Sequence, residues 1–429
     1  MNRIYIETYG CANNMAESQI MAGILTRNNF EIINNIELSD VVILNTCSVK
    51  NATINKIIYR MREIQKKYPG KKLIISGCMP ETEYDLIIRT APDASIVSTN
   101  HITKITKAVT EKRRVEFIGS NKEIKVCLPK MRNNHVIDIV PICSGCASFC
   151  SFCSTKLAKG NVFSYPEDKI IGEISNAKKF GAKEFWITGQ DVSAYGLDTN
   201  EISLLPELIN KITERVGGKY FLRIGMLNPR HVIPILSKLI KSYKSDNVFK
   251  FLHLPVQTGS DRILKKMNRG YKAEDFVEIV ERFRRLIPDI TVWTDIITGF
   301  PEETENDFEL SVKIVEMTRP DFVNISKFSS HHNTPASKLK QVSSELKKER
   351  SRLLTDTAKK ISKEKNEKWI GWKGAVLIDD FNRKRQNWIG RNFAYKPVAV
   401  LTKERLRLGQ FVDVEIIDAK PSCLIGVSV

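Results

Sequence analysis

The sequence has 429 residues but contains no apolar run that approaches the length of a membrane-spanning helix, about twenty residues. Its first residues lead into a strand-like pattern and lack the basic and apolar segments of a secretory signal. Repeats at a solenoid period are also missing. We therefore expect a cytoplasmic protein without a membrane partner, folded into about three domains.

Acidic residues are fewer than basic residues. Lys and Arg number 67, whereas Asp and Glu number 49, so the formal net charge is +18. This excess favours a polyanionic partner such as nucleic acid. A generally Lys-rich solvated surface would produce the same imbalance, so the charge alone does not identify the partner.

The chain has only six His but nine Cys. In a reducing compartment, this many cysteines favours metal or redox chemistry over disulfides. The odd number fits two groups of three, with Cys127, Cys143 and Cys423 left over. We expect those three to be structural.

Three of the cysteines lie close together in the sequence and provide one ligand fewer than a complete cluster site needs. They occupy residues 145–153 (GCASFCSFC) as Cys146, Cys150 and Cys153. A cubic iron–sulfur cluster usually takes four thiolates, so three leave one iron open for a reactant. A zinc site would need a fourth Cys or a His, and the nearest candidate, Cys143, lies on the wrong side of a predicted strand end. Phe149 and Phe152 are expected to keep water away from the cluster.

Three further cysteines each follow an apolar segment that has the pattern of a strand. The segments begin at Ile4, Val41 and Leu73, and the cysteines that follow them are Cys11, Cys47 and Cys78. Helical patterns near 15–26 and 51–67 separate the strands, which predicts a parallel α/β sheet. Because parallel strands end at one edge of a sheet, we expect the three thiols to meet there and hold a second cluster with an open iron. Taken singly, each cysteine would more often be a small buried apolar residue.

Six strand patterns alternate with helical patterns in the middle of the chain. The predicted strands are 136–141, 184–188, 221–226, 249–254, 290–297 and 322–328. Six such units predict an incomplete (β/α) barrel, whose site lies at the C-terminal ends of the strands. Polar residues follow several strands there, and the candidates for binding a cofactor or substrate are Gln190, Asp191, Gln257 and Asp295. Each could equally be an N-cap or loop residue.

The last sixty or so residues change character. A charged helical stretch at 344–368 precedes five short strand patterns, at 375–378, 388–390, 394–400, 411–417 and 424–427. They predict a compact OB-like β-barrel of the kind that binds oligonucleotides. Basic and aromatic residues mix within it, and the basic candidates for RNA contact are Arg383, Lys384, Arg385, Arg391 and Lys396. Such a mixture holds phosphates by charge and bases by stacking, although single aromatic residues more often fill the core.

The first cysteine group resembles the signature of the radical S-adenosylmethionine (SAM) superfamily, and nearly the whole chain is similar to the methylthiotransferases within it. The likeness is carried by 7–14 (ETYGCANN), 45–49 (NTCSV) and 76–80 (SGCMP), together with the barrel and a tail that resembles a TRAM domain. The resemblance implies a methylthiotransferase domain over 1–115, a radical SAM core over 132–365 and a TRAM domain over 366–429.

In that family, a methylthio group replaces a hydrogen removed from an inert C–H bond. The resemblance therefore implies SAM and two 4Fe-4S clusters: one on Cys146, Cys150 and Cys153 that generates the radical, and an auxiliary one on Cys11, Cys47 and Cys78. It also implies tRNA, a one-electron reductant and a sulfur donor as partners of a protein that we expect to be a monomer.

Residues 154–166 (STKLAKGNVFSYP) and 390–398 (GRNFAYKPV) resemble the archaeal and eukaryotic branch of the family. That branch acts on N6-threonylcarbamoyladenosine at tRNA position 37. A second branch modifies isopentenyladenosine at the same position, and a third modifies an aspartate of a ribosomal protein. A reading of another class, an RNA-binding iron–sulfur redox sensor without turnover, would need the clusters and the basic tail but not the barrel motifs.

Three segments depart from the family pattern. Lys159 stands where an Arg-Gly pair is usual, which keeps the positive charge but loses the planar fork of Arg. Glu302 and Glu303 follow Gly-Phe-Pro where Gly is expected. Residues 330–335 (SHHNTP) replace an Arg-Pro-Gly-Thr-Pro segment, so a role of that loop in substrate contact cannot be carried over. We expect its two His residues to be loop residues, with a metal or proton-transfer role as the alternative.

Overall fold

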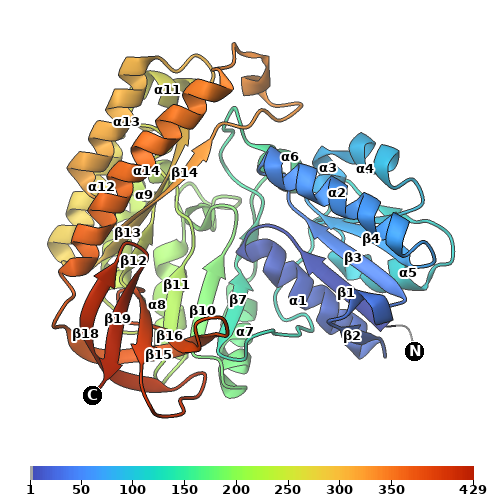
Figure 1. Ribbon diagram of the computed structural model, residues 1–429, viewed down its shortest axis with the longest axis horizontal. Coiled ribbons are helices and arrows are strands. Elements are labelled where there is room, and N and C mark those ends of the chain that lie inside the picture. Colours follow the sequence, from blue (N-terminus) through green and yellow to red (C-terminus); the bar gives the residue numbers. More distant parts are fainter. Residues whose placement is uncertain (1–2) are drawn as a thin grey trace.

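The structure, a computed structural model, describes residues 3–429. Figure 1 shows an N-terminal α/β domain on the right, a central half-barrel, and a small β-barrel at the lower left. No helix of the described residues is long and apolar enough to cross a membrane.

The N-terminal domain is built on a parallel sheet with the strand order β2-β1-β3-β4-β5-β6. The strands are β1 (Arg3–Thr8), β2 (Glu31–Ile33), β3 (Val41–Thr46), β4 (Lys72–Gly77), β5 (Ser95–Ser98) and β6 (Glu116–Phe117). The helices are α1 (Ala12–Arg27), α2 (Asn51–Lys67), α3 (Met79–Thr82), α4 (Tyr84–Thr90) and α5 (Ile105–Thr110), with 3-10 turns η1 (Ile36–Leu38) and η2 (Ile102–Lys104).

Alternate residues of the strands belong to two separate hydrophobic cores, because successive side chains point to opposite faces of the sheet. Val42 and Leu44 of β3 pack with α2 and α4, whereas Val41 and Ile43 pack with α1 and α5. The sheet is therefore covered on both faces, as expected for a parallel sheet. Its strands end on the edge that faces the central domain.

The central domain contains six parallel strands in two curved sheets, β7-β10-β11 and β12-β13-β14. The strands are β7 (Ile137–Pro141), β10 (Glu184–Thr188), β11 (Phe221–Ile224), β12 (Phe251–His253), β13 (Thr291–Thr298) and β14 (Phe322–Lys327). A bridge between Leu222 and Val248 continues the first sheet toward the second. The predicted incomplete barrel of six units is confirmed.

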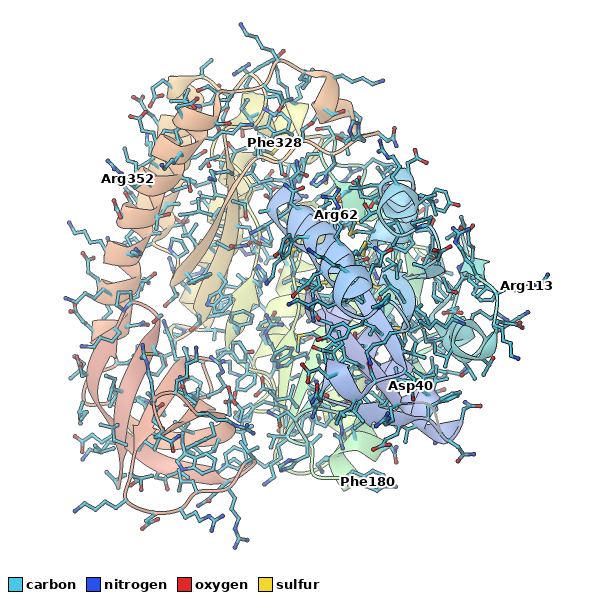
Figure 2. The ribbon with its side chains drawn as sticks, turned by 45° about the vertical axis from the view of Figure 1, so that its right-hand side comes forward. Asp40, Arg62, Arg113, Phe180, Phe328 and Arg352 are labelled. Carbon is cyan, nitrogen blue, oxygen red and sulfur yellow. The ribbon has the colours of Figure 1, made fainter. Side chains whose placement is uncertain are left out.

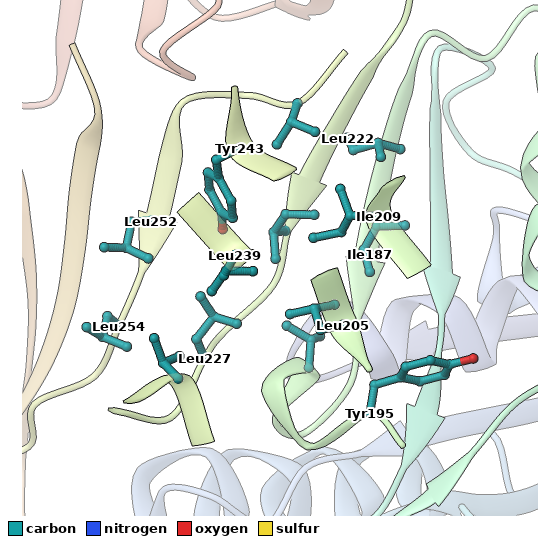
Figure 3. Packing of buried hydrophobic residues seen from close by; sticks show 14 of the residues in the cluster. Ile187, Tyr195, Leu205, Ile209, Leu222, Leu227, Leu239, Tyr243, Leu252 and Leu254 are labelled. Atoms are coloured by element: carbon teal, nitrogen blue, oxygen red, sulfur yellow. The ribbon is translucent and has the colours of Figure 1, made fainter. Parts of the chain in front are cut away.

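Helices cover the outside of this half-barrel. They are α7 (Glu167–Lys179), α8 (Leu205–Arg215), α9 (Pro229–Val232), α10 (Leu236–Tyr243), α11 (Asp261–Lys266), α12 (Ala273–Leu286), α13 (Glu305–Thr318) and α14 (Ser344–Glu367), with η3 (Val192–Ala194), η4 (Ile233–Ile235) and η5 (Pro335–Lys338). Figure 3 shows Ile209, Leu239 and Tyr243 from the helices packed against Leu222 and Leu252 from the strands. Two short antiparallel strands of two residues each, β8 (Cys143–Ser144) and β9 (Phe163–Ser164), pair with each other. The segment between them contains the loop of the first cysteine group and the short helix α6 (Ser154–Lys159).

The C-terminal strands close into a five-stranded barrel in the order β15-β16-β17-β19-β18, which confirms the predicted small β-barrel. They are β15 (Lys373–Asn382), β16 (Asn387–Arg391), β17 (Pro397–Leu401), β18 (Phe411–Lys420) and β19 (Cys423–Ser428). Tyr395 packs on Phe249 and Phe251, so this barrel covers the end of the half-barrel at which the strands begin. The other end, where the cysteines lie, remains turned toward the N-terminal domain (Figure 1).

Candidate metal centres and nucleic-acid surface

The first cysteine group, Cys146, Cys150 and Cys153, lies in the loop between β8 and α6. The loop is tied down at both sides of Cys150, since the carbonyl of Phe149 accepts a hydrogen bond from Asn268 at 2.8 Å and the hydroxyl of Ser151 donates to the carbonyl of Lys266 at 2.7 Å. Lys266 ends α11 and Asn268 lies two residues beyond it. The two bonds thereby fix the loop to the barrel.

A buried guanidinium contacts the sulfur of Cys150. Nη1 of Arg269 donates to Cys150 Sγ at 3.1 Å, and Nη2 donates to Asn228 Oδ1 at 3.3 Å. The amide of Asn228 in turn donates to Ser148 Oγ in the cysteine loop, at 2.9 Å. Arg269 is 7% exposed and Asn228 4% exposed, so this network stands out of bulk water, where hydrogen bonds to charged groups are stronger.

The second cysteine group, Cys11, Cys47 and Cys78, collects where β1, β3 and β4 end. Each cysteine comes within three residues of the end of its strand, and Cys11 and Cys78 each precede a helix, α1 and α3. Two glycines allow the chain segments that carry these cysteines to lie close together. Gly10 and Gly77 both have positive φ, and a Cβ on Gly10 would lie 2.9 Å from the Cβ of Cys47.

The thiols of each group are close enough to influence one another. Burial raises the pKa of Cys78 to about 12, and negative charge on Cys11 and Cys47 adds to the rise. Burial likewise raises the pKa of Cys146 to about 12, with contributions from Asp191, Cys153 and Cys150. These thiols are therefore poor free nucleophiles at neutral pH, and binding to a metal would have to displace their protons.

The arrangement fits a cluster better than a single ion. Within residues 3–429, no three His, Cys, Asp or Glu side chains are grouped so that they could hold one metal ion. A zinc ion needs all its sulfur ligands at about 2.3 Å, whereas each thiolate of an iron–sulfur cube binds its own iron and stands further from the others. Two groups of three thiols, one where β1, β3 and β4 end and one in the loop before α6, match the three protein ligands that a cube with one open iron takes.

The residues predicted to bind a cofactor have different surroundings. Asp191 is buried and caps η3: Oδ1 accepts from the backbone N–H of Ser193 at 3.0 Å, and Oδ2 accepts from His231 at 2.8 Å. This carboxylate is saturated by protein partners. Gln190 differs, because its buried Oε1 has no hydrogen-bond partner within the described chain.

On the second sheet, the carboxylate of Asp295 accepts from His253 Nε2 at 2.9 Å and from Asn324 at 2.7 Å. Gln257 pairs with the same strand through its backbone and has a φ of 72°, in the left-handed region. Gln257 lies beyond the end of β12 and Asp295 lies in the C-terminal half of β13, and both are partly exposed, so a ligand would have access.

The five basic residues predicted to contact RNA divide into two sets. Arg383, Lys384 and Arg385 are exposed in the turn between β15 and β16. Lys396 is 4% exposed and donates to Asp321 at 2.6 Å and to Asn366 at 2.8 Å. Arg391 lies against the carboxylate of Asp379 at 3.1 Å and the ring of Tyr395.

The geometry counts against Lys396, because its buried ion pair with Asp321 joins the C-terminal barrel to the central domain and leaves the ammonium unavailable to phosphate. Arg391 is partly exposed and pairs with Asp379 within the barrel, so its contact with RNA stays a prediction. Their sequence context, basic residues between aromatic ones, cannot tell a solvent-facing cation from one that is paired with an acid more than ten residues away.

Phe149, expected to exclude water, is 62% exposed and lies under the ammonium of Lys156 instead. Phe152 does pack inward, edge-on to Phe300.

Glu302 has a φ of 63°, which accounts for the Gly expected there, and pairs with Lys266. His331 is buried and donates from Nε2 to the carbonyl of Val49 at 2.9 Å, joining its loop to the N-terminal domain.

Sequence reasoning missed Arg269 and Asn228. Asn228 is the one polar side chain between the end of β11 and Pro229, in the sequence GMLN at 225–228. Arg269 follows α11 within a run of basic and small residues and carries no local signal. Its partner Cys150 lies 119 residues earlier, so only the fold brings the two together.

Comparison with known proteins agrees with these three parts. The chain matches the uncharacterized protein family UPF0004 over residues 3–99, the radical SAM superfamily over 140–315 and the TRAM domain over 373–429. Among solved structures, the radical SAM methyltransferase TsrM from Kitasatospora setae superimposes with a TM-score of 0.57 at 13% identity, covering 79% of this chain and 75% of that one. This likeness concerns the fold.

Relatives of similar length extend the match to the whole chain. A probable threonylcarbamoyladenosine tRNA methylthiotransferase from Methanothermobacter thermautotrophicus is 39% identical over 427 residues, covering 99% of both chains. One from Pyrococcus horikoshii is 40% identical with the same coverage, and the threonylcarbamoyladenosine tRNA methylthiotransferase of Homo sapiens is 32% identical over 98% of this chain and 72% of its own. The chain therefore belongs to the threonylcarbamoyladenosine tRNA methylthiotransferase family, within the radical SAM superfamily.

Proposed function

We propose that this protein converts N6-threonylcarbamoyladenosine at position 37 of tRNA to its 2-methylthio derivative. The observation that carries the proposal is the neighbouring position of the two cysteine groups, since Ser154, next to Cys153, donates to the carbonyl of Ser48, next to Cys47. The chain that carries them matches the named relatives from end to end. A single group of three cysteines would support radical chemistry alone, and the second group adds a site for sulfur.

The cysteines would be the only protein ligands of the two clusters. Cys146, Cys150 and Cys153 would hold the cluster of the radical centre, and Cys11, Cys47 and Cys78 the auxiliary cluster, each with one iron left open. A reduced cluster with SAM bound would supply a 5′-deoxyadenosyl radical, which is the means of breaking an inert C–H bond.

The chain's own polar residues prepare the radical centre. Arg269 donates to a cysteine sulfur and holds Asn228, which orients the cysteine loop through Ser148. Gln190, with an unpartnered oxygen, and the partly exposed Gln257 and Asp295 are the residues we assign to SAM or to the target base. Asp191 would act through its hold on η3 and His231.

The C-terminal barrel would bind the RNA. Arg383, Lys384 and Arg385 form an exposed cationic turn at its outer end, where phosphates have free access. We assign 1–115 to the auxiliary cluster, 132–365 to the radical SAM core and 366–429 to RNA binding, in a monomeric cytoplasmic enzyme. Turnover would also require a one-electron reductant and a sulfur donor, both supplied from outside the chain.

The test is a reaction of reconstituted protein with SAM, a reductant, sulfide and tRNA that carries either threonylcarbamoyladenosine or isopentenyladenosine. We expect the 2-methylthio product only with the first tRNA, accompanied by 5′-deoxyadenosine. Product with the isopentenyl tRNA alone would reassign the substrate. Replacement of Cys11, Cys47 and Cys78 by Ala should abolish methylthiolation but leave SAM cleavage, whereas loss of SAM cleavage after verified cluster loading of the wild-type chain would contradict enzymatic function.

A further inference from the structure

Helix α6 connects the two cysteine groups directly. Cys153 is its N-cap, and the helix packs on α3, which begins after Cys78. The hydroxyl of Ser154, next to Cys153, donates to the carbonyl of Ser48, next to Cys47, at 2.9 Å. At the other end of α6, the side chain of Asn100 donates to the carbonyl of Ala158 at 3.2 Å. Helix α6, six residues long, therefore connects the loop of the first cysteine group to the domain that carries the second.

Lys159, the last residue of α6, reaches into the N-terminal domain. Its ammonium donates to Glu17 Oε1 at 2.8 Å and to Thr99 Oγ1 at 2.6 Å, and its side chain is 2% exposed. Glu17 belongs to α1, the helix that Cys11 precedes, and Thr99 bonds through its backbone to Gly77, the residue before Cys78. Lys159 thus contacts the helix that follows Cys11 and a residue whose backbone is bonded to Gly77, next to Cys78.

A second lysine shares the same carboxylate oxygen. Lys125 donates to Glu17 Oε1 at 2.6 Å and is equally enclosed, at 4% exposure of its side chain. Glu17 Oε2 has no hydrogen-bond partner within residues 3–429. Two ammonium groups therefore face one carboxylate in a region that excludes water, and the local charge is positive.

The two lysines are carried by different elements. Lys125 also donates to the carbonyl of Thr99, so both ammonium groups contact the same two residues. Lys159 differs because it is carried by α6, the helix that begins at a cysteine of the first group. Burial alone would raise the pKa of Glu17, but the two ammonium groups lower it to about 2, so the carboxylate is ionised at neutral pH.

We propose that Lys159 is the positioning and charge-balancing residue of the auxiliary centre. A cluster on three thiolates concentrates negative charge in a buried space, and a fixed ammonium beside it stabilises that charge far more than it would in water. Because the ammonium is carried by α6, its position depends on the loop of the radical centre. The inference rests on the proposed function, since it assumes the auxiliary cluster.

The experiment isolates that cluster in the full-length chain. In a Cys146→Ala/Cys150→Ala/Cys153→Ala background, the auxiliary cluster is reconstituted, its iron is counted, and its midpoint potential is measured by a redox titration followed by electron paramagnetic resonance. Removing a positive neighbour disfavours the reduced state. We expect Lys159→Met to make reduction on the order of tenfold less favourable, a midpoint about 59 mV more negative for a one-electron couple.

Three matched variants separate charge from structure. Lys159→Arg keeps the charge and should keep the potential near that of the background. Lys130→Met removes another nearly enclosed ammonium, which pairs with Asp138 and Glu173 of the central domain, and should shift the potential by much less. Glu17→Gln keeps an oxygen for the lysines, removes the negative charge, and should move the midpoint in the opposite direction, to more positive values.

The outcomes are distinguishable. Two results would mean that these residues act only by holding the fold, and either would overturn the inference. One is an equal shift for Lys159→Met and Lys130→Met, and the other is a shift of the same sign for Lys159→Met and Glu17→Gln. If Lys159→Met fails to retain a cluster, Glu17→Gln decides: a shift to more positive values supports the inference, and no shift or a negative shift overturns it. Absence of any cluster in the background protein would overturn the auxiliary centre in the proposed function, and the inference with it.

Discussion

At the scale of single residues, the site depends on buried cations that contact sulfur or surround it. Arg269 and Lys159 are both nearly enclosed; Arg269 contacts Cys150, and Lys159 contacts Glu17 and Thr99 beside the second group. A charge held out of water acts strongly on its neighbours because the surrounding dielectric is low. The cysteines alone would therefore not determine how bound clusters behave.

Arg269→Gln should lower the midpoint potential of the radical cluster, because the change removes both a positive charge and a hydrogen bond to Cys150 Sγ. The effect is expected to be on the order of tenfold in the reduction equilibrium, about 59 mV. It would be measured in a chain whose second cysteine group is replaced by Ala. Arg262→Gln is the control, since Arg262 is partly exposed and pairs with Asp307. An equal shift in both variants would contradict the role of Arg269.

His331 predicts a pH dependence of stability. Burial lowers its pKa, although the bond to Val49 opposes this, so the folded chain resists protonation below the ordinary value of about 6.5. The unfolded chain then binds more protons, and this contribution to stability is lost as the pH falls through and below about 6.5. His331→Gln should unfold with a shallower dependence of its unfolding free energy on pH from about 7 to 5.

The neighbouring exposed His332 provides the matched variant, His332→Gln, which leaves the bond to Val49 in place. Chemical denaturation of the two variants and the wild type at several pH values makes the comparison. A slope that is the same for His331→Gln and the wild type would show that the buried imidazole does not contribute.

The limits of sequence reasoning are clearest at this scale. The six cysteines were found because their spacing and their places after strands are local patterns. Glu17, Arg269 and Asn228 were not found, since their partners lie far along the chain and any single buried charge looks like a surface charge in the sequence. Lys396 shows the converse: its place among aromatic residues predicts a surface cation, but its ammonium pairs with Asp321.

At the scale of helices and strands, prediction was more successful. Asn51–Lys67 forms α2 and Glu184–Thr188 forms β10 with the bounds expected, and all six barrel strands are present. Periodicity and strand length decide these elements within a few residues. The short helix α6 has too few residues for a periodic signal, and its packing between two domains was not predicted.

Contacts between elements of different domains are where we expect the largest effect on stability. Lys396→Met would leave Asp321 buried without its cation, at an expected cost of about 3–5 kcal/mol in the free energy of unfolding. Lys384→Met, in the exposed turn of the same barrel, should change it by about 0.5 kcal/mol or less. Thermal or urea unfolding tests the pair. Similar stability of the two variants would mean that this contact does not hold the barrel in place.

At the scale of the whole molecule, the positive charge is distributed. Figure 2 shows Arg62 on α2, Arg113 beyond α5 and Arg352 on α14 in well-separated places. Part of the net charge of +18 is therefore an ordinary solvated surface, as the sequence left open. The cationic turn of the C-terminal barrel is one local concentration within it.

The turn gives a test of RNA binding that leaves the fold intact. Replacing Arg383, Lys384 and Arg385 with Gln should weaken tRNA binding and reduce the slope of its salt dependence by up to about 2, because each lost phosphate contact on a single strand contributes about 0.7. SAM cleavage without tRNA should be unchanged. Unaltered affinity over a salt titration would contradict RNA binding at this turn.

These substitutions are preferable to deletion of the barrel. Removing the residues after 368 would uncover Phe249 and Phe251 and leave Asp321 without Lys396. Loss of binding in such a truncated chain could then come from unfolding of the central domain.

The central claim is that this chain is the enzyme that places a methylthio group on threonylcarbamoyladenosine in tRNA. The most direct measurement is nucleoside mass spectrometry of tRNA from cells with and without the gene. We predict that the 2-methylthio form of threonylcarbamoyladenosine disappears without the gene while its unmodified precursor accumulates. Loss of the methylthio form of isopentenyladenosine instead, or an unchanged set of tRNA nucleosides, would contradict the account.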